Sequence, residues 1–253
     1  MDSKLVNSSG VQSEKPKREK KGKSLIDFPE SYIVIDIETT GLFPGYDSII
    51  EIAALKIEDG KCIDTFCSLV KPEEYLIKED GHKNDYPTEF VINEDGKKTY
   101  YIDSFISDLT GITNTMLNSA PKSEMVLPRL KSFLSNSIVV GHNVNFDINF
   151  LYDEFMTILA FPIENNFIDT LRIARRVLTE LPSHRLIDLA VHYSISSSGS
   201  HRALKDCEIT NICYLNLKNE VLKKYGSMES FINVVNSRTR SNSQTQKAKD
   251  ILS

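Results

Sequence analysis

The sequence contains no apolar run that approaches the roughly 20 residues a membrane-spanning helix needs. Its first residues are polar and basic, and they lack the apolar core of a secretory signal peptide. Only four cysteines occur in 253 residues, and their spacing matches neither a zinc-binding pattern nor a disulfide scaffold. We therefore expect a cytoplasmic protein with no membrane partner and with reduced thiols.

Positively charged residues are also fewer than negatively charged ones. The chain has 30 Lys and Arg residues against 35 Asp and Glu residues, which gives a formal net charge of −5. A protein that passively coats nucleic acid is usually basic, so this balance argues against that class. It does not argue against a nuclease built on a carboxylate cluster, because bound divalent cations would offset the charge locally. The apolar fraction of 40% is enough for a buried core.

The length suits one domain with polar tails. We predict a disordered basic tail over residues 1–25, one folded domain over 26–225 and a polar C-terminal tail over 226–253. A charged stretch near 78–103 is interpreted as an inserted loop or small hairpin. The basic run in the first tail is either simply solvated or makes a weak electrostatic contact with nucleic acid.

Strands come first along the chain, and strands that alternate with helices follow. Residues 31–38 are almost all apolar or β-branched, which predicts a strand buried on both faces. Strands that begin at Ser48 and Cys62 are joined by a short EDGK turn, which predicts a hairpin. Apolar spacing predicts a short strand over 137–143 and helices over 121–134, 146–158, 169–178, 185–193 and 201–223. This order predicts an α/β layer fold with a mixed sheet.

Two acidic residues, Asp36 and Glu38, end the first predicted strand. Residues two apart in a strand project from the same face, so the two carboxylates should sit side by side. Thr39, Thr40 and Gly41 then form a polar loop that leaves the strand. Gly41, which has no side chain, would let a ligand approach the backbone closely. Alone, such a pair is also what a strand end in solvent looks like, so its meaning depends on the rest of the chain.

Two later segments add acidic residues and a histidine. Asp147 falls in the first turn of a predicted helix, where the helix dipole stabilises an anion. Asp206 shares a helical face with small or moderately apolar residues, so its carboxylate should point inward, where it needs a cation. His201 precedes that helix on a loop rich in Ser and Gly. Singly, each also fits a plainer interpretation as a helix-start or loop residue.

Taken together, these segments resemble the histidine subgroup (DEDDh) of the DEDD exonuclease superfamily. They are most similar to the proofreading domains associated with bacterial replicative DNA polymerases, of the epsilon-subunit and PolC type. The resemblance covers about residues 31–220 and rests on VIDIETTG, IIEIAAL, LTGITNTML, APKSEMVL, VVGHNVNFDINFL, DTLRIAR and HRALKDCEIT. It implies an RNase H-like α/β fold with a five-stranded mixed sheet flanked by helices. The stretch near 78–103 departs from the compact family pattern.

The resemblance also implies a chemistry. The expected activity is metal-dependent 3′→5′ hydrolysis of phosphodiester bonds at the 3′ end of DNA, with release of nucleoside 5′-monophosphates, in proofreading or repair. His201 would remove the proton from the attacking water, since the pKa of a histidine suits that task. Two divalent ions, Mg²⁺ or Mn²⁺, would be held by Asp36, Glu38, Asp147 and Asp206.

Contacts with the nucleotide are expected near the first two acidic segments. The residues assigned to substrate binding are Thr39, Thr40, Gly41, Leu42, Asn143 and Phe146. Leu42 would pack against the terminal base, and because stacking tolerates any base we expect little sequence preference. Glu51, in a buried strand, is expected to be structural. The expected partners are a nucleic acid with a free 3′ end, DNA before RNA, and a DNA polymerase subunit.

Three alternatives stay open at this point. An RNA-trimming exonuclease of the ribonuclease T or oligoribonuclease type would use the same catalytic groups, so the motifs do not separate it from a DNA exonuclease. A non-catalytic nucleic-acid-binding module could keep the fold, although such a module should lack one or more of the five residues. A structural α/β domain with chance carboxylates is the third.

Overall fold

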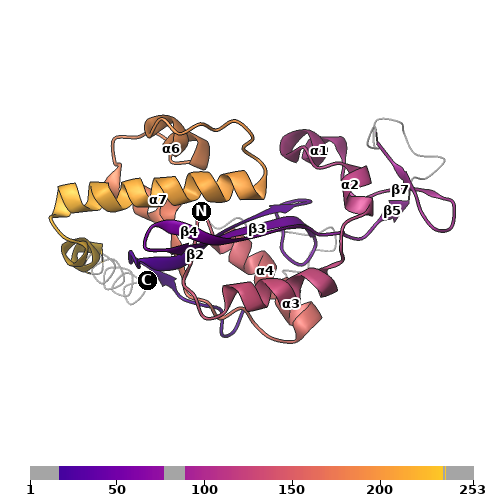
Figure 1. The fold of residues 1–253 in the computed structure, drawn as a ribbon, viewed down its shortest axis with the longest axis horizontal. Coiled ribbons are helices and arrows are strands. Elements are labelled where there is room, and N and C mark those ends of the chain that lie inside the picture. The colour runs from indigo at the N-terminus through magenta and orange to yellow at the C-terminus, as the bar shows by residue number, and fades with distance from the viewer. Residues whose placement is uncertain (1–16, 77–88, 236, 238–253) are drawn as a thin grey trace, which may run out of the picture.

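A computed structural model describes residues 17–76, 89–235 and 237, and the fold is built on a central mixed sheet of six strands (Figure 1). The spatial order of the strands is β1-β9-β8-β2-β3-β4. Strands β2, β3 and β4 pair antiparallel, whereas β1, β9, β8 and β2 pair parallel. Their bounds are β1 Ser24–Leu25, β2 Ser31–Thr39, β3 Ile49–Glu58, β4 Lys61–Leu69, β8 Val139–Gly141 and β9 Phe167–Asp169.

Helices cover both faces of this sheet (Figure 1). One layer contains α5 (Thr170–Val177), α6 (Leu186–His192) and α7 (Ala203–Tyr225), and α7 packs on β2 and β3. The other layer contains α3 (Ser123–Leu134) and α4 (Asn145–Leu159). The predicted α/β architecture is therefore confirmed. Among the described residues, no helix combines the length and the apolar character needed to cross a membrane.

The central strand β2 explains how one stretch of sequence serves both layers. Tyr32 and Val34 belong to the core beneath α5, α6 and α7, while Ile33 and Ile35 belong to the core with α3 and α4. Both faces of the strand are thus buried, which is why its sequence is a continuous apolar run. Asp36 continues the side of Tyr32 and Val34, so its side chain faces the layer that contains α7.

The sheet has six strands where five were expected, because residues assigned to the basic tail contribute one. Leu25 of β1 pairs with Ile168 of β9, and Leu25 packs against the core. Upstream, the Arg18 guanidinium donates hydrogen bonds to the carboxylate of Asp153, including one of 2.9 Å from Nε, and Lys21 donates to side chains of α4. Residues 17–25 are therefore ordered by polar contacts that apolar periodicity does not reveal. Residues 1–16 lie outside the described part.

A second, smaller lobe follows β4. Its three-stranded sheet has the order β5-β7-β6, and two short helices cover it at one end of the molecule (Figure 1). The hairpin of β6 and β7 matches the small hairpin expected in the charged stretch, and residues 77–88 lie outside the described part. The bounds are β5 Tyr75–Leu76, β6 Val91–Ile92, β7 Lys98–Tyr100, α1 Ser104–Thr110 and α2 Asn114–Asn118.

The chain after α7 also differs from the expected polar tail. Residues 228–235 are helical, and Phe231 and Val235 are buried in the core beneath α7. The Phe231 ring lies 5.0 Å from that of Tyr225 and 6.4 Å from that of Phe28, measured between ring centroids. Met228, Phe231 and Val235 recur at helical spacing and pack against this core, so an apolar face fixes the short segment. Residues 238–253 lie outside the described part.

Candidate active site

Three carboxylates from two distant segments meet at one end of β2. Asp36 and Glu38 project from the same face of that strand, and Asp206 comes from the first turn of α7. One carboxylate oxygen of each residue lies within 4.8 Å of those of the other two. The structure thus brings together three of the four acidic residues that the sequence assigned to a metal site.

Small residues let the start of α7 approach the sheet closely. Ala203 and Cys207 are fully buried, and the Sγ atom of Cys207 lies 3.3 Å from the carbonyl oxygen of Ala53 in β3. Desolvation by burial is the main reason why the pKa of this thiol is raised, so Cys207 is a packing residue and not a nucleophile. Larger side chains at these two positions would lift Asp206 away from β2.

The pairing of β2 with β3 changes register beside the acidic residues. Glu38 faces Glu51 across the ladder, but the next residue, Thr39, faces Ile49. Such a bulge bends the strand and re-aims the side chains around it, and bulges are common next to active sites. Here it marks the point where β2 leaves the sheet and the loop after Thr39 begins.

Asp147 occupies a separate place beside β2. It lies in the first turn of α4, it is buried, and its Oδ1 atom accepts a hydrogen bond of 3.1 Å from the backbone N–H of Ile37. It is not one of the three carboxylates that lie within 4.8 Å of one another, although its charge contributes to the raised pKa of Asp36. The structure therefore places Asp147 next to the cluster and fastens it to the strand.

Burial and mutual repulsion perturb all four carboxyl groups. Desolvation is the main reason why the pKa of Asp36 lies well above its usual value, and the charges of Asp147, Glu38 and Asp206 add to it. The pKa of Glu38 rises to about 8, chiefly by burial and then through Asp206 and Glu51. Burial is also the first cause of the raised pKa of Asp147 and of Asp206. Oxygen ligands that repel one another in this way suit a hard divalent cation.

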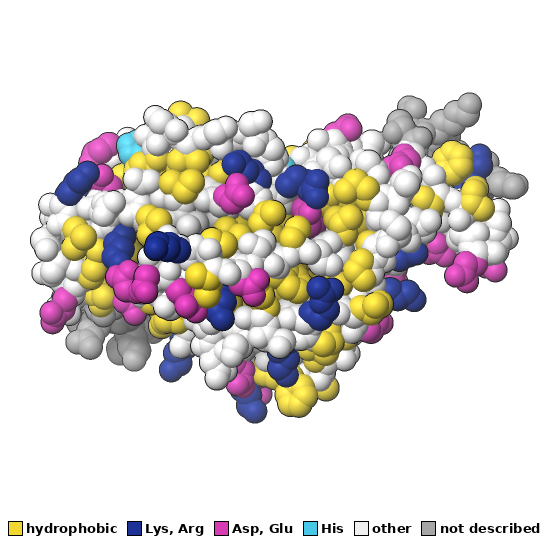
Figure 2. Space-filling view, viewed as in Figure 1, with side chains coloured by type: hydrophobic (Ala, Val, Ile, Leu, Met, Phe, Trp, Pro, Cys, Tyr) yellow, Lys and Arg dark blue, Asp and Glu magenta, His cyan; other side chains and the backbone are white. Residues whose placement is uncertain are grey.

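His201 lies on the loop just before α7. Its backbone N–H donates a hydrogen bond of 3.1 Å to Oδ2 of Asp206, and its φ of 66° is in the left-handed region. The residue is exposed to solvent. In Figure 2 the surface dips between the part formed by α6 and α7 and the lobe that contains α1, and this end of α7 borders the dip.

The loop after β2 is held by its own hydrogen bonds. The Thr39 hydroxyl donates to the carbonyl oxygen of Gly41, and the Thr40 hydroxyl accepts from the Ser48 N–H. A Cβ atom at Gly41 would lie 2.5 Å from the carboxylate of Asp47, so the fold of the loop itself requires a glycine here. Leu42 is 72% exposed and is thereby available for contact.

The two predicted contacts from the second acidic segment differ in exposure. Asn143 is exposed, has a φ of 60°, and donates its backbone N–H to the Asp169 carboxylate. Phe146 is half-buried, and its ring lies 4.8 Å from that of Phe150, so part of its surface is used for packing. Asp169 also caps α5 by accepting from the Leu171 N–H, so this one carboxylate joins the loop that carries Asn143 to the start of α5.

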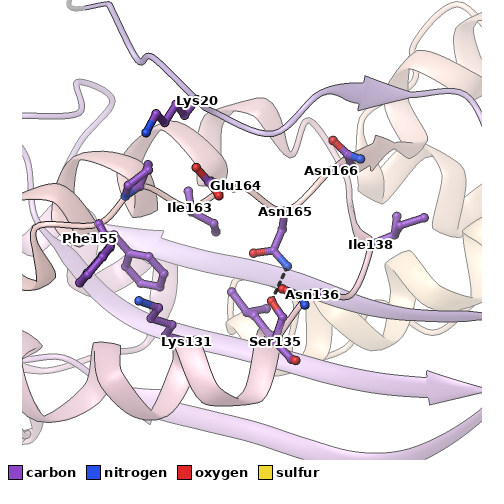
Figure 3. A pocket seen from close by; sticks show the side chains of 13 residues that line it. Lys20, Lys131, Ser135, Asn136, Ile138, Phe155, Ile163, Glu164, Asn165 and Asn166 are labelled. Carbon is purple, nitrogen blue, oxygen red and sulfur yellow. Dashed lines mark hydrogen bonds between the residues drawn. The ribbon is translucent and has the colours of Figure 1, made fainter.

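A pocket of about 450 Å³ lies elsewhere, between the N-terminal segment, the end of α3 and the loop after α4 (Figure 3). Lys131, Asn165 and Glu164 are among the residues that line it, and the Nδ2 atom of Asn165 is engaged with the carbonyl oxygen of Ser135. None of the four clustered or adjacent acidic residues lines this pocket. It is distinct from the candidate site.

Comparison with known proteins agrees with this geometry. A family model described as "Exonuclease" matches residues 33–83 and 77–214, which include every residue of the acidic site. The chain belongs to this exonuclease family. The two matched segments meet within the inserted stretch, which agrees with the departure from the family pattern noted there.

The relatives of this chain include two long bacterial proteins named "DNA polymerase III PolC-type". The one from Oceanobacillus iheyensis is 34% identical over 197 residues, and the one from Thermotoga petrophila is 34% identical over 196 residues. Each alignment covers 78% of this chain but only 12% of the relative. The chain thus spans about an eighth of the length of the curated relatives it matches.

Solved exonuclease structures share its fold. Exonuclease X in complex with 5′ overhanging duplex DNA superposes with a TM-score of 0.52 and 22% identity, covering 80% of this chain and 98% of that one. The zinc-bound form of the E. coli ExoI–ssDNA complex gives 0.59 and 18%, covering 83% and 42%. The RNase H-like fold expected from the sequence is thereby confirmed.

Proposed function

We propose that this exonuclease hydrolyses phosphodiester bonds at the 3′ end of DNA and releases nucleoside 5′-monophosphates one at a time. The observation that carries the proposal is the meeting of Asp36, Glu38 and Asp206 within 4.8 Å, beside a loop that exposes His201. Four carboxyl groups with raised pKa values in one place are costly to a fold and are typical of functional sites. The family membership of the chain gives the cluster its chemistry.

Asp36, Glu38 and Asp206 would hold a divalent metal ion, and Asp147 would support a second one. The donor set fits, because all of these side chains offer carboxylate oxygens. Such hard donors suit hard cations such as Mg²⁺ or Mn²⁺. When bound, such ions supply Lewis-acid stabilisation of charge on the phosphate oxygens and lower the pKa of a water. The identity and number of the ions are part of the proposal.

His201 would accept the proton of the attacking water. Its exposed ring stands on a loop whose backbone is fixed to Asp206, so base and carboxylate are held in one local unit. A neutral imidazole can take a proton at physiological pH and return it to solvent. Asp147, bonded to the strand between Asp36 and Glu38, would keep these two carboxylates in place.

The loop after β2 would contact the terminal nucleotide. Leu42 exposes an apolar surface that can pack against a base, and the Thr39–Gly41 backbone lies next to the acidic residues. Asn143 and the exposed edge of Phe146 would contact the sugar or the next nucleotide. Apolar and aromatic contacts of this kind tolerate any base, so single-stranded or frayed ends of any sequence are the expected substrate.

The biological setting that we propose is proofreading or repair, beside a DNA polymerase. This follows from the PolC-type names of the relatives, in which the matched segment is one part of a much longer chain. The solved exonucleases with this fold include complexes with duplex and single-stranded DNA, which favours DNA as substrate here. The cytoplasmic location inferred from the sequence stays a prediction.

The decisive experiment is digestion of end-labelled DNA and RNA oligonucleotides of the same sequence, with Mg²⁺, with Mn²⁺ and with a chelator. We expect stepwise shortening of DNA from its 3′ end, release of 5′-monophosphates and no activity with the chelator. Faster digestion of RNA would establish the RNA-trimming alternative. Cleavage of a closed circular strand, which has no end, would contradict the exonuclease mechanism.

A further inference from the structure

Glu51 presents an electrostatic problem beside the acidic cluster. It is only 1% exposed, and it lies directly opposite Glu38 in the β2–β3 ladder, so both side chains leave the same face of the sheet. Two like charges in this arrangement repel each other, and burying an unpaired carboxylate is costly. The fold therefore requires a cation beside Glu51. The segment that supplies this cation is thereby held close to the acidic cluster.

Arg202 supplies that cation, and it does so with a fixed geometry. Its Nη2 atom lies 2.7 Å from Oε1 of Glu51, and its Nε atom lies 3.1 Å from Oε2. The same carboxylate also accepts a hydrogen bond of 3.0 Å from the backbone N–H of Ala203. Glu51 thus binds both the side chain that precedes α7 and the first backbone N–H of the helix itself.

These bonds fix the segment that carries two of the proposed active-site residues. His201 immediately precedes Arg202, and Asp206 follows one turn later. The backbone N–H of His201 is bonded to Asp206, so residues 201–206 form one unit, attached to β3 through Glu51. The other two carboxylates of the cluster belong to β2, the strand next to β3.

We propose that Glu51 and Arg202 are positioning residues of the hydrolytic reaction. Their ion pair, in which the Glu51 side chain is buried and the Arg202 side chain is 42% exposed, ties the start of α7 to β3, and so sets where His201 and Asp206 stand relative to Asp36 and Glu38. This positioning role adds two residues to the function proposed above and rests on that function. Neither residue is assigned contact with the substrate, and the sequence-based interpretation of Glu51 as structural is extended to a role in catalysis.

The conservative variants Arg202→Lys and Glu51→Gln test this role. Lysine keeps the charge of Arg202 but cannot form its bidentate hydrogen bonds. Glutamine keeps the shape of Glu51 and can still accept a hydrogen bond from the Ala203 N–H. We expect each variant to fold, to show a kcat about 10–100-fold lower at saturating Mn²⁺, and to keep a KM for single-stranded DNA within about 3-fold. Mn²⁺ binding, measured by calorimetry without substrate, should weaken by about 10-fold or more.

A matched control is the ion pair of Arg18 and Asp153, which also joins two distant segments through a two-pronged contact. Arg18→Lys should lower the melting temperature to a similar extent but leave kcat and Mn²⁺ affinity unchanged. A folded Arg202→Lys protein with the kcat and Mn²⁺ affinity of the wild type would overturn the proposal. An equal loss of kcat in Arg18→Lys would also overturn it, because general destabilisation would then explain both.

The outcomes separate this inference from the proposed function. A wild-type protein that digests no DNA or RNA end would remove the proposed function itself, and with it the reaction to which the pair could contribute. A wild-type protein that is active, with variants that are equally active, would remove only the positioning role. The Arg202→Lys protein, if it fails to fold, is replaced by Glu51→Gln, which retains a hydrogen-bond partner for both Arg202 and Ala203.

Discussion

The carboxylate of Asp147 is bonded to the backbone N–H of Ile37, the residue between Asp36 and Glu38. Helix α4 is thereby attached to β2 at Ile37, the residue that stands between two proposed metal ligands. The bond means that Asp147 has two separable tasks. One is structural and needs only an acceptor oxygen, and the other is electrostatic and needs a negative charge.

Substitution of Asp147 by asparagine should separate these tasks. The amide oxygen can still accept from Ile37, so the melting temperature should stay close to that of the wild type, while kcat falls by about 10–100-fold. Asp147→Ala should lose the same activity and also about 1–3 kcal/mol of stability, because the Ile37 N–H is left buried without a partner. Thermal unfolding and single-turnover digestion of a labelled oligonucleotide measure the two effects. Full activity in Asp147→Asn would show that the charge is not used.

Removal of the imidazole should affect catalysis without affecting metal binding. His201→Ala is expected to lower kcat by about 10²–10⁴-fold, which is the usual contribution of a general base. Its Mn²⁺ affinity should stay that of the wild type, because the three clustered ligands are carboxylates. His192→Ala, at the exposed end of α6, is the control and should be fully active. An unchanged kcat in His201→Ala would assign the proton transfer to another group.

The acidic cluster should make the metal-free protein less stable as pH rises. The pKa of Glu38 is about 8 in the folded protein, against 4.5 for an unperturbed glutamate. Between these values the unfolded chain has released the proton and the folded chain still holds it, so the folded state binds more protons and the free energy of unfolding falls with increasing pH. A carboxyl group in this state also binds metal more tightly at higher pH, because the cation displaces the proton.

Melting temperatures from pH 5 to pH 8, in the presence of a chelator, measure this effect. We expect a steady decrease for the wild type and a shallower one for Glu38→Gln, whose side chain carries no proton to lose. The slope should not vanish, because the pKa values of Asp36 and Asp147 are raised as well. Added Mn²⁺ should stabilise the wild type most at the high end of this range. A wild-type melting temperature that rises with pH would contradict the raised pKa values.

The sequence predicted the parts of the fold in which an apolar pattern extends over many consecutive residues. Strand β2 was recognised because both of its faces are apolar, and α7 because its apolar residues recur at helical spacing. Strand β1 was missed because two residues are too few to show a period. Its place in the sheet depends on a partner strand, β9, that is itself only three residues long.

The candidate site divides in the same way. Asp36, Glu38 and Asp206 were chosen from local patterns and from a family resemblance, and the structure brings them together. The contact between Glu51 and Arg202 could not be predicted, because it depends on the register of two strands and on the depth at which α7 packs. The contact between Gly41 and the Asp47 carboxylate could not be predicted for the same reason, since Asp47 approaches the glycine through the fold of the loop.

Leu42 offers the sharpest test of the nucleotide contacts. It is 72% exposed on a loop that Asp47 stabilises by accepting a hydrogen bond from Phe43, so its side chain contributes little to the core. Leu42→Ala should therefore leave the melting temperature and Mn²⁺ affinity unchanged. If the side chain packs against the terminal base, KM for single-stranded DNA should rise by about 10–150-fold, which corresponds to the roughly 1.5–3 kcal/mol of burying one leucine side chain.

The matched control for this substitution is Val191→Ala, an equally exposed apolar residue on α6, for which KM should not change. A wild-type KM in Leu42→Ala would remove the base contact from this residue and leave the terminal nucleotide to be held by the backbone of residues 39–41 and by the carboxylate-bound metal. An equal rise of KM in both variants would show that exposed apolar surface in general, and not this loop, binds the strand.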